Sequence, residues 1–410
     1  MQNGTRLDAV RDHNQGLVLG QILRLEGPSR SEIAERIGLT AAAVSRITRD
    51  LIDAGLVSEG DEQVANPGQR GRRNIPLLPR ARGAFFLAVS LTISDRRVSL
   101  VDLTGRRVAE AAIGGGLPSS YPALTDTIAK TATRLLALKN VSRPRLLGLA
   151  AITSGAVDAA GQVLDSSLDV LRGRDLVADL QLRLGIPALA ETVGRALGVA
   201  ETMRAAGTGG LRLPGPTLVL HVAFGLGVAI LLDGAPVRST ADERMAGHIA
   251  VPGAKGRCIC GATGCLMTAA AGFGILQRLR RTADRPASWA DMRASELAEA
   301  VAAAEVGGEV RTAFAAAGRV MGQHLFALGA PVGPRQVLLA GPVAAAAPYA
   351  AAARESLVQA FRRAGLAPPP VIVSHMDYLQ AAERLALVEF ALARPLDLGP
   401  LLAGATSRPL

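Results

Sequence analysis

The 410-residue sequence is poor in aromatic side chains and contains only three cysteines. Because Phe, Trp and Tyr together make up 3% of the chain, the core must be built from Ala, Val, Leu and Ile. Three cysteines cannot all pair within one chain, which argues against a disulfide framework. No unbroken apolar run reaches the roughly 18 residues of a membrane span, and the N-terminus lacks a signal-peptide pattern. We expect a cytoplasmic protein of two or three domains with no membrane segment.

Positive charge is in excess and is unevenly distributed. The 45 Lys and Arg residues outnumber the 35 Asp and Glu residues, which gives a net charge of +10. No Asp or Glu occurs between Val64 and Ser94, whereas this stretch holds five arginines: Arg70, Arg72, Arg73, Arg80 and Arg82. Such an excess fits an acidic partner such as nucleic acid. A basic linker that is simply solvated is the alternative interpretation.

Three short helical patterns precede this basic stretch. The first is Leu17–Gly27, where a Gly-Pro pair ends the apolar periodicity. The second begins with a capping-box signature, Ser29 followed by Glu32, and ends at Gly38. The third follows Thr40, its expected N-cap, and runs to Gly55. Two helices joined by a tight glycine-containing turn predict a helix-turn-helix.

The third helix has two different faces. One face is formed by Val44, Ile47, Thr48 and Leu51, and the other by Ala41, Ala42, Ser45, Arg46 and Arg49. Small side chains let a helix approach the bases, and arginines bond to guanine edges or phosphates. Two strand patterns, LVSEG and RRNIPLL, surround a polar loop and make the predicted domain winged. The alternative is a small helical bundle with no ligand.

We therefore predict a DNA-binding surface on this helix and on the arginine-rich segment behind the wing. A flexible Gly/Arg segment beside a reading helix can enter the minor groove. For Arg72 and Arg73 this is a hypothesis, and a phosphate contact or simple solvation is an equal alternative. The predicted DNA-binding residues are Ala42, Ser45, Arg46, Arg49, Arg72 and Arg73.

Strand and helix patterns alternate through the rest of the chain. Phe85–Asp102 predicts two strands joined by a turn, and Thr217–Gly234 predicts a second such pair. Helical patterns occur at Tyr121–Leu138 and Leu176–Gly185. Two strand pairs in corresponding places, each followed by α/β alternation, predict a duplicated α/β architecture with a cleft between its halves.

All three cysteines lie within eight residues, in the spacing Cys258-x-Cys260-x4-Cys265, and His248 lies ten positions before the first of them. The intervening glycines allow turns tight enough to point three sulfur atoms inward. Three thiolates and one imidazole complete a tetrahedral zinc site, and four protein ligands leave no position for an activated water. We predict structural rather than catalytic Zn²⁺; buried reduced cysteines or a redox pair are the alternatives.

These motifs resemble one family. The segment SRSEIAERIGLTAAAVSRITRDLIDAGLVSEG is similar to the winged helix-turn-helix heads of ROK-family regulators (repressors, open reading frames and kinases), and His248 with CICGATGCL matches that family's zinc motif. The resemblance covers the remaining chain and implies a two-lobed actin-like (ribonuclease-H-like) ATPase fold of the α/β class. The expected domains are 1–80, the DNA-binding head with its Arg-rich linker; 81–200, a first lobe closed by a C-terminal helix at 376–400; and 201–375, a second lobe with the zinc site.

The resemblance also locates the groups that a kinase of the family needs, and two of them are replaced. The phosphate hairpin, Asp-x-Gly-Gly-Thr in the kinases, corresponds to Ser90–Ser94, which has neither Asp nor Gly. Val193 stands at the position of the general-base aspartate, and valine cannot accept a proton. The Phe224–Gly227 hairpin keeps some glycine character, which alone is weak support for phosphate binding. We predict that the protein is not an enzyme.

The implied sugar pocket is altered as well. Ser167 stands where the family has a sugar-binding Asn, and methionines stand where it has two glutamates, which removes strong acceptors and adds flexible apolar volume. This argues against a simple hexose and leaves a sugar-derived, larger or more apolar effector, or none. The expected cleft residues are Ser167, Glu191, Thr192, Met245, His248 and Met267.

Together these features predict a DNA-binding transcriptional regulator, most simply a repressor, with a catalytically inactive sugar-kinase-like effector domain. A homodimer or homotetramer would present paired heads to a palindromic double-stranded DNA operator with half-sites one or more helical turns apart. An active ROK sugar kinase with an appended head is one alternative. A regulator with no small-molecule effector is the other.

Overall fold

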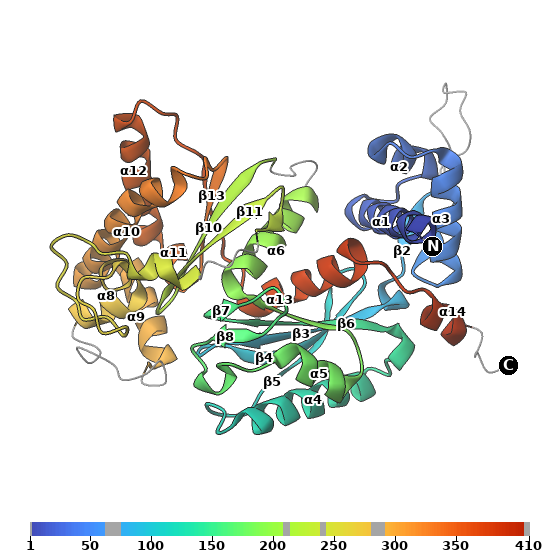
Figure 1. Ribbon diagram of the computed structural model, residues 1–410, viewed down its shortest axis with the longest axis horizontal. Coiled ribbons are helices and arrows are strands. Elements are labelled where there is room, and N and C mark those ends of the chain that lie inside the picture. Colours follow the sequence, from blue (N-terminus) through green and yellow to red (C-terminus); the bar gives the residue numbers. More distant parts are fainter. Residues whose placement is uncertain (1, 62–74, 208–213, 238–242, 280–291, 406–410) are drawn as a thin grey trace.

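The N-terminal head is a three-helix domain with a two-stranded wing (Figure 1). The computed structural model describes residues 2–61, 75–207, 214–237, 243–279 and 292–405. The capping box at Ser29 and the left-handed Gly38, with φ of 69°, confirm the predicted ends of the second helix. The strands of the wing pair in antiparallel fashion. The elements are α1 (Gln2–Arg24), α2 (Arg30–Ile37), α3 (Ala41–Asp53), β1 (Val57–Glu59) and β2 (Leu77–Pro79).

Two boundaries in the head differ from the sequence prediction. Helix α1 begins at Gln2 rather than Leu17, because the preceding residues are helical without an apolar stripe to reveal them. Strand β2 is shorter than the predicted RRNIPLL segment and covers only Leu77–Pro79. Arg72 and Arg73 lie outside the described residues, so their predicted role stays a hypothesis.

The first lobe is built on a five-stranded sheet in the order β5-β4-β3-β6-β9. Strand β3 pairs in antiparallel fashion with β4, as predicted for Phe85–Asp102, and in parallel fashion with β6. Every residue of the central strand β3 is buried, which explains why all of its residues except Ser90 are apolar. The elements are β3 (Phe85–Leu91), β4 (Arg96–Asp102), β5 (Arg107–Ala112), α4 (Tyr121–Leu138), β6 (Leu146–Thr153), β7 (Ala156–Val157), β8 (Val163–Asp165), α5 (Leu176–Leu184) and β9 (Ala188–Thr192).

The second lobe repeats this arrangement in the order β12-β11-β10-β13-β14. Its first two pairings are antiparallel and its last two parallel, as in the first lobe, which confirms the predicted duplication. The strands are β10 (Pro216–Val222), β11 (Leu226–Leu232), β12 (Ala235–Pro236), β13 (Gln336–Ala340) and β14 (Val371–Val373). The helices are α7 (Leu266–Ala270), α8 (Gly272–Arg278), α9 (Ala294–Val306), α10 (Gly308–Gly329), α11 (Pro342–Ala345) and α12 (Ala347–Arg363).

Two equivalent helices join the lobes. Helix α6 (Val193–Gly207) follows the last strand of the first sheet, and α13 (Tyr378–Leu387) follows the last strand of the second. They pack against each other, and each also packs on the sheet of the opposite lobe, α6 on β11 and α13 on β3 (Figure 1). Helix α13 lies within the C-terminal segment 376–400 that was expected to close the first lobe, and this domain assignment stays a proposal. The predicted lobe boundary at residue 200 falls inside α6 and stays a proposal.

The chain ends in two short elements beside the head. A π-helix, Val388–Ala393, continues α13 and packs against α1, and α14 (Gly399–Ala405) packs against the 3-10 helix Arg143–Arg145. One continuous apolar core therefore includes head residues such as Leu19 and Leu56 together with Phe86 of the first sheet and Phe390 of the π-helix. Within the described ranges, no helix combines the length and the apolar composition that a membrane crossing requires.

Candidate functional site

Helix α3 presents the face that the sequence predicted for DNA. Ala42, Arg46 and Arg49 are exposed and Ser45 is half-buried, whereas Val44, Ile47, Thr48 and Leu51 are buried in the head. The side chain of Thr40 accepts a hydrogen bond from the backbone N–H of Ala43, which fixes the start of the helix. The exposed face thus carries small residues and two guanidinium groups, a surface suited to a DNA groove.

A polar contact fixes α3 relative to the wing. Arg30 Nε donates to Thr48 Oγ1 at 2.9 Å, and an Nη atom of the same guanidinium pairs with Glu59 Oε1 at 2.7 Å. Arg30 begins α2, Thr48 lies on α3 and Glu59 ends β1. One arginine therefore ties together the two helices of the helix-turn-helix and the first wing strand, so that the outward face is presented as a unit.

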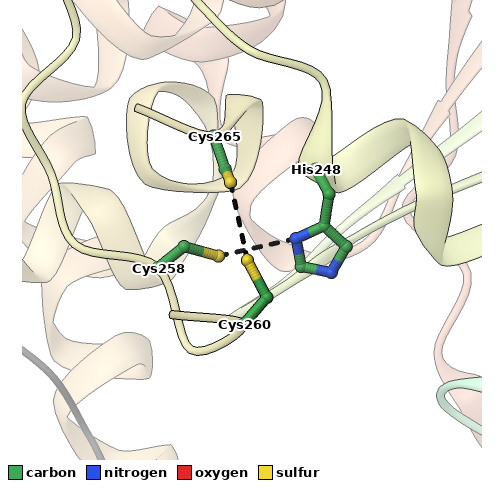
Figure 2. A group of neighbouring side chains, drawn as sticks. All are labelled: His248, Cys258, Cys260 and Cys265. Carbon is green, nitrogen blue, oxygen red and sulfur yellow. Dashed lines mark hydrogen bonds between the residues drawn. The ribbon is translucent and has the colours of Figure 1, made fainter. Parts of the chain in front are cut away.

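The four predicted metal ligands converge at one point (Figure 2). One ligand atom from each of His248, Cys258, Cys260 and Cys265 lies within 4.8 Å of all the others. His248 Nδ1 is 3.5 Å from Cys258 Sγ, and the sulfur atoms of Cys260 and Cys265 are 3.7 Å apart. Burial raises the pKa of the Cys258 thiol to about 12, so its thiolate needs a cation beside it. This cluster could bind a metal ion, and its donor set is the one that zinc prefers.

Backbone contacts hold the loop that carries these cysteines. The backbone N–H of Cys258 donates to Ala262 O at 2.8 Å, and that of Gly264 donates to Gly256 O at 2.9 Å. Gly264 has a φ of +81°, and a Cβ at this position would lie 2.7 Å from Ala254 O, so glycine is required there. Cys265 is the N-cap of α7, which leads the chain from the metal loop into the second lobe.

A cavity of about 420 Å³ lies between the lobes and reaches the metal loop. Of the expected cleft residues, Ser167, Thr192, His248 and Met267 line it. Cys260 and Ile259 of the metal loop also line it. A bound metal would therefore shape one wall of this cavity.

Two expected cleft residues are not among those that line the cavity. Glu191 is 1% exposed, and its Oε1 accepts from Arg195 Nη1 at 2.9 Å, so it forms a buried ion pair at the start of α6. Met245 is 66% exposed on the 3-10 helix that leads to His248. The family resemblance located their positions in the sequence but could not tell which way each side chain faces.

The cavity has a charged end that the sequence reasoning did not identify. Arg172 Nε pairs with Asp165 Oδ1 at 2.7 Å, and its Nη2 pairs with Asp169 Oδ1 at 3.2 Å. All three residues line the cavity, next to Ser154 and Ser167, whose hydroxyls are hydrogen-bonded to each other. The Arg-Gly-x-Asp-Leu segment that starts at Arg172 was the available signal. These groups can hydrogen-bond to a polar ligand.

At another point on the cavity wall, a hydrogen bond joins the two lobes. His221 of β10 and Tyr378 of α13 both line the cavity, and His221 Nε2 lies 2.8 Å from Tyr378 Oη. Burial lowers the pKa of His221 to about 4 and raises that of Tyr378. The imidazole is therefore neutral at physiological pH, and the tyrosine is protonated.

The groups of a phosphotransferase are replaced where the resemblance placed them. Val193 lines the cavity with an apolar side chain. The turn between β3 and β4 is occupied by internal contacts: Arg96 Nη1 donates to the carbonyls of Thr92 and Ile93 at 3.1 and 2.6 Å. Arg97 pairs with Asp95 in the same turn at 2.5 Å. This hairpin closes on itself and does not present a glycine backbone to a phosphate.

Comparisons with known proteins agree with this architecture. The model of the ROK family matches residues 87–386, and that of the MarR family matches residues 12–69. A relative from Escherichia coli (strain K12), the DNA-binding transcriptional dual regulator NagC, is 26% identical over 421 residues, which is 97% of each chain. The DNA-binding transcriptional repressor Mlc of the same strain is 23% identical over 274 residues, 66% of each chain.

Solved structures show the same fold. A ROK family transcriptional regulator, a homologue of the E. coli Mlc protein, superimposes with a TM-score of 0.71 at 21% identity and covers 97% of this chain and 98% of its own. A ROK hexokinase from Thermus thermophilus superimposes with a TM-score of 0.56 at 22% identity, covering 74% of this chain and 97% of its own. The kinase thus matches the two-lobed body, and the regulator also matches the head.

Proposed function

This chain belongs to the ROK family, and from that premise we propose that it is a DNA-binding transcriptional regulator, most simply a repressor, whose sugar-kinase-like body does not transfer phosphate. The observation that carries the proposal is the exposed face of α3, with Arg46 and Arg49, on a winged head joined to a body whose general-base position is Val193. A relative that shares both parts over nearly its whole length is a transcriptional regulator by name.

The partner that we propose is double-stranded DNA. The residues that would contact it are Ala42, Ser45, Arg46 and Arg49, with Arg72 and Arg73 in the adjoining segment. A homodimer or homotetramer would present two heads at once, so the operator should be a palindrome. Arginine contacts to phosphates make affinity fall with salt, and contacts to base edges make it sequence-dependent.

We further propose that His248, Cys258, Cys260 and Cys265 hold a structural zinc ion. Four protein ligands fill a tetrahedral site, so the ion would brace the loop rather than activate water. Because His248 and Cys260 also line the cavity, the ion would keep this wall in place. In the absence of zinc, the cavity should lose its shape on that side.

The cavity is the proposed effector site. Relatives in E. coli and Shigella flexneri are named N-acetylglucosamine repressors, but Met267 and Val193 make this cavity more apolar than a simple hexose requires. We therefore propose a sugar derivative with an apolar substituent, its polar end near Ser167 and Arg172. Such a ligand changes DNA binding only if it binds two states of the protein with different affinity.

Two measurements test this function. Purified protein incubated with fragmented genomic DNA of its source should retain a small set of fragments that share a palindrome, and a protein that retains no fragment above background would contradict the proposal. In the second, the protein is incubated with ATP and a panel of hexoses and N-acetylhexosamines. We expect no sugar phosphate, and turnover would instead support the alternative of a kinase with an appended head.

A further inference from the structure

A single arginine of the first lobe contacts the C-terminal end of the predicted recognition helix. Arg145 is the last residue of the 3-10 helix that precedes β6. Its Nη1 atom donates to the backbone oxygens of Ala54 and Gly83, both at 2.8 Å. Ala54 is the C-cap of α3, and Gly83 lies just before β3. One guanidinium therefore joins the recognition helix, the connection between domains and the first sheet.

The positive charge of Arg145 suits its position at the C-terminal end of α3. The last carbonyl groups of a helix lack partners within the helix and carry partial negative charge. Arg145 supplies a cation to one of them and is itself half-buried. Its guanidinium donates to these two carbonyls, and among the residues that the structure describes no carboxylate forms an ion pair with it. The hydrogen bonds to Ala54 O and Gly83 O are therefore the main polar interactions of the Arg145 side chain.

The backbone around Arg145 is packed too closely for the head to rotate freely. A Cβ at Gly83 would lie 2.6 Å from Gly55 O and 3.0 Å from the Cα of Leu56, so only glycine fits there. The backbone N–H of Arg80 donates to Leu56 O at 2.8 Å. The connection therefore lies directly on the end of the helix-turn-helix, and Arg145 holds both segments together.

A second contact holds the other side of the head. A Cβ at Gly16 of α1 would lie 2.3 Å from the backbone oxygen of Leu392 in the C-terminal π-helix, so the two backbones touch. In Figure 1 the head lies over the first lobe and the C-terminal segment, away from the second lobe. Two contacts at separate points fix an orientation, which one contact alone would not do.

We propose that Arg145 is a positioning residue for operator reading: it sets the angle between α3 and the body, and thereby the spacing of half-sites that a dimer recognises. This inference rests on the proposed function. In a dimer formed through the bodies, the separation of the two recognition helices depends on how each head is fixed to its own body. Half-sites on one face of the duplex are separated by whole turns of about 10 bp. A loosened head would accept spacings that a fixed head rejects.

The test compares the full-length wild-type protein with Arg145→Met, which keeps the aliphatic bulk and removes the donors. Arg143→Met is the matched control, because Arg143 is exposed on the same 3-10 helix and its Nη2 lies beside Gly185 of the first lobe rather than the head. A half-site is first selected from a random duplex library with wild-type protein. Affinity is then measured on duplexes in which the spacer between two copies of that half-site is lengthened one base pair at a time.

We expect the wild type and Arg143→Met to prefer the best spacer over one longer by half a turn, about 5 bp, by roughly ten-fold or more. For Arg145→Met this ratio should fall to about three-fold or less, while the base preference within each half-site stays the same. A purely structural defect would weaken binding at all spacers equally. An unchanged spacing ratio in Arg145→Met would overturn the inference and leave the proposed function standing.

The remaining outcomes are equally decisive. A wild-type protein that selects no duplex would overturn the proposed function, and this inference with it. Thermal unfolding and metal content show whether Arg145→Met is folded. If it is not, Arg145→Lys is used instead, because lysine keeps a cation that can reach one of the two carbonyls. Its spacing ratio should then fall between those of the wild type and the loosened head, and a ratio equal to that of the wild type would count against the inference.

Discussion

The Oη atom of Tyr378 lies 2.8 Å from Nε2 of His221, and this hydrogen bond connects the two lobes at the wall of their shared cavity. His221 belongs to β10 of the second sheet, and Tyr378 begins α13, which covers the first sheet. The π-helix that continues α13 reaches the head at Leu392. The hydrogen bond therefore involves the first residue of the helix that leads from the cavity towards the DNA-binding head.

The first prediction concerns pH. His221 has a pKa of about 4 in the folded protein, against 6.5 ordinarily, so the unfolded chain takes up a proton first as the pH falls. The stability due to neutral His221 is complete above pH 6.5 and is lost progressively towards pH 4. His221→Gln cannot take up this proton. Denaturant unfolding of both proteins at several pH values should therefore show the wild type losing more stability than the variant over this interval. Parallel curves would contradict the assignment.

The second prediction concerns the exposed face of α3. Replacing Arg46 or Arg49 with Ala removes a guanidinium that reaches bases or phosphates, which should lower operator affinity by about ten-fold or more. The fold should be unaffected because both side chains are exposed. Arg319→Ala on α10 removes the same charge far from the head and serves as the control. Equal affinities for all three variants in a fluorescence titration would show that another surface binds DNA.

Much of the head could be predicted because its signals are local. The capping box of Ser29 and Glu32 spans four residues, and Gly38 marks the end of the same helix. The cluster that could bind a metal ion was also predictable, because three of its four residues lie in one short loop. The duplicated architecture was predictable as well, because each strand or helix pattern is visible within a few consecutive residues.

The contacts that connect these parts could not be predicted. His221 and Tyr378 are 157 positions apart, and Arg145 is 91 positions from Ala54. No local sequence pattern therefore predicts either contact. Whether a single side chain points into the cleft is equally hidden from the sequence. Glu191 and Met245 were expected in the cleft, but burial of the first in an ion pair and exposure of the second depend on the packing of whole elements.

The third prediction concerns the metal. Cys260→Ser removes one thiolate while leaving an exposed side chain of similar size, so zinc content and thermal stability should fall together. A strong chelator should lower the stability of the wild type and have much less effect on the variant. Zinc per chain is measured by mass spectrometry, and unfolding by circular dichroism. A variant with no zinc and wild-type stability would contradict a structural role.

The last prediction concerns the contact between α1 and the C-terminal π-helix. A Cβ at Gly16 would lie 2.3 Å from Leu392 O, whereas a Cβ at Gly20, about one turn further along, would lie 3.7 Å from Leu392 Cδ2. Gly16→Ala must therefore displace α1 from the π-helix, because the backbone oxygen of Leu392 cannot move aside. Gly20→Ala makes an ordinary contact and replaces glycine in a helix, which should stabilise the protein by about 0.5–1 kcal/mol. Thermal unfolding should thus shift in opposite directions for the two variants. Limited proteolysis should release the head faster from Gly16→Ala only. If both variants gain stability, α1 does not rest on the backbone of Leu392, and the π-helix does not fix the orientation of the head.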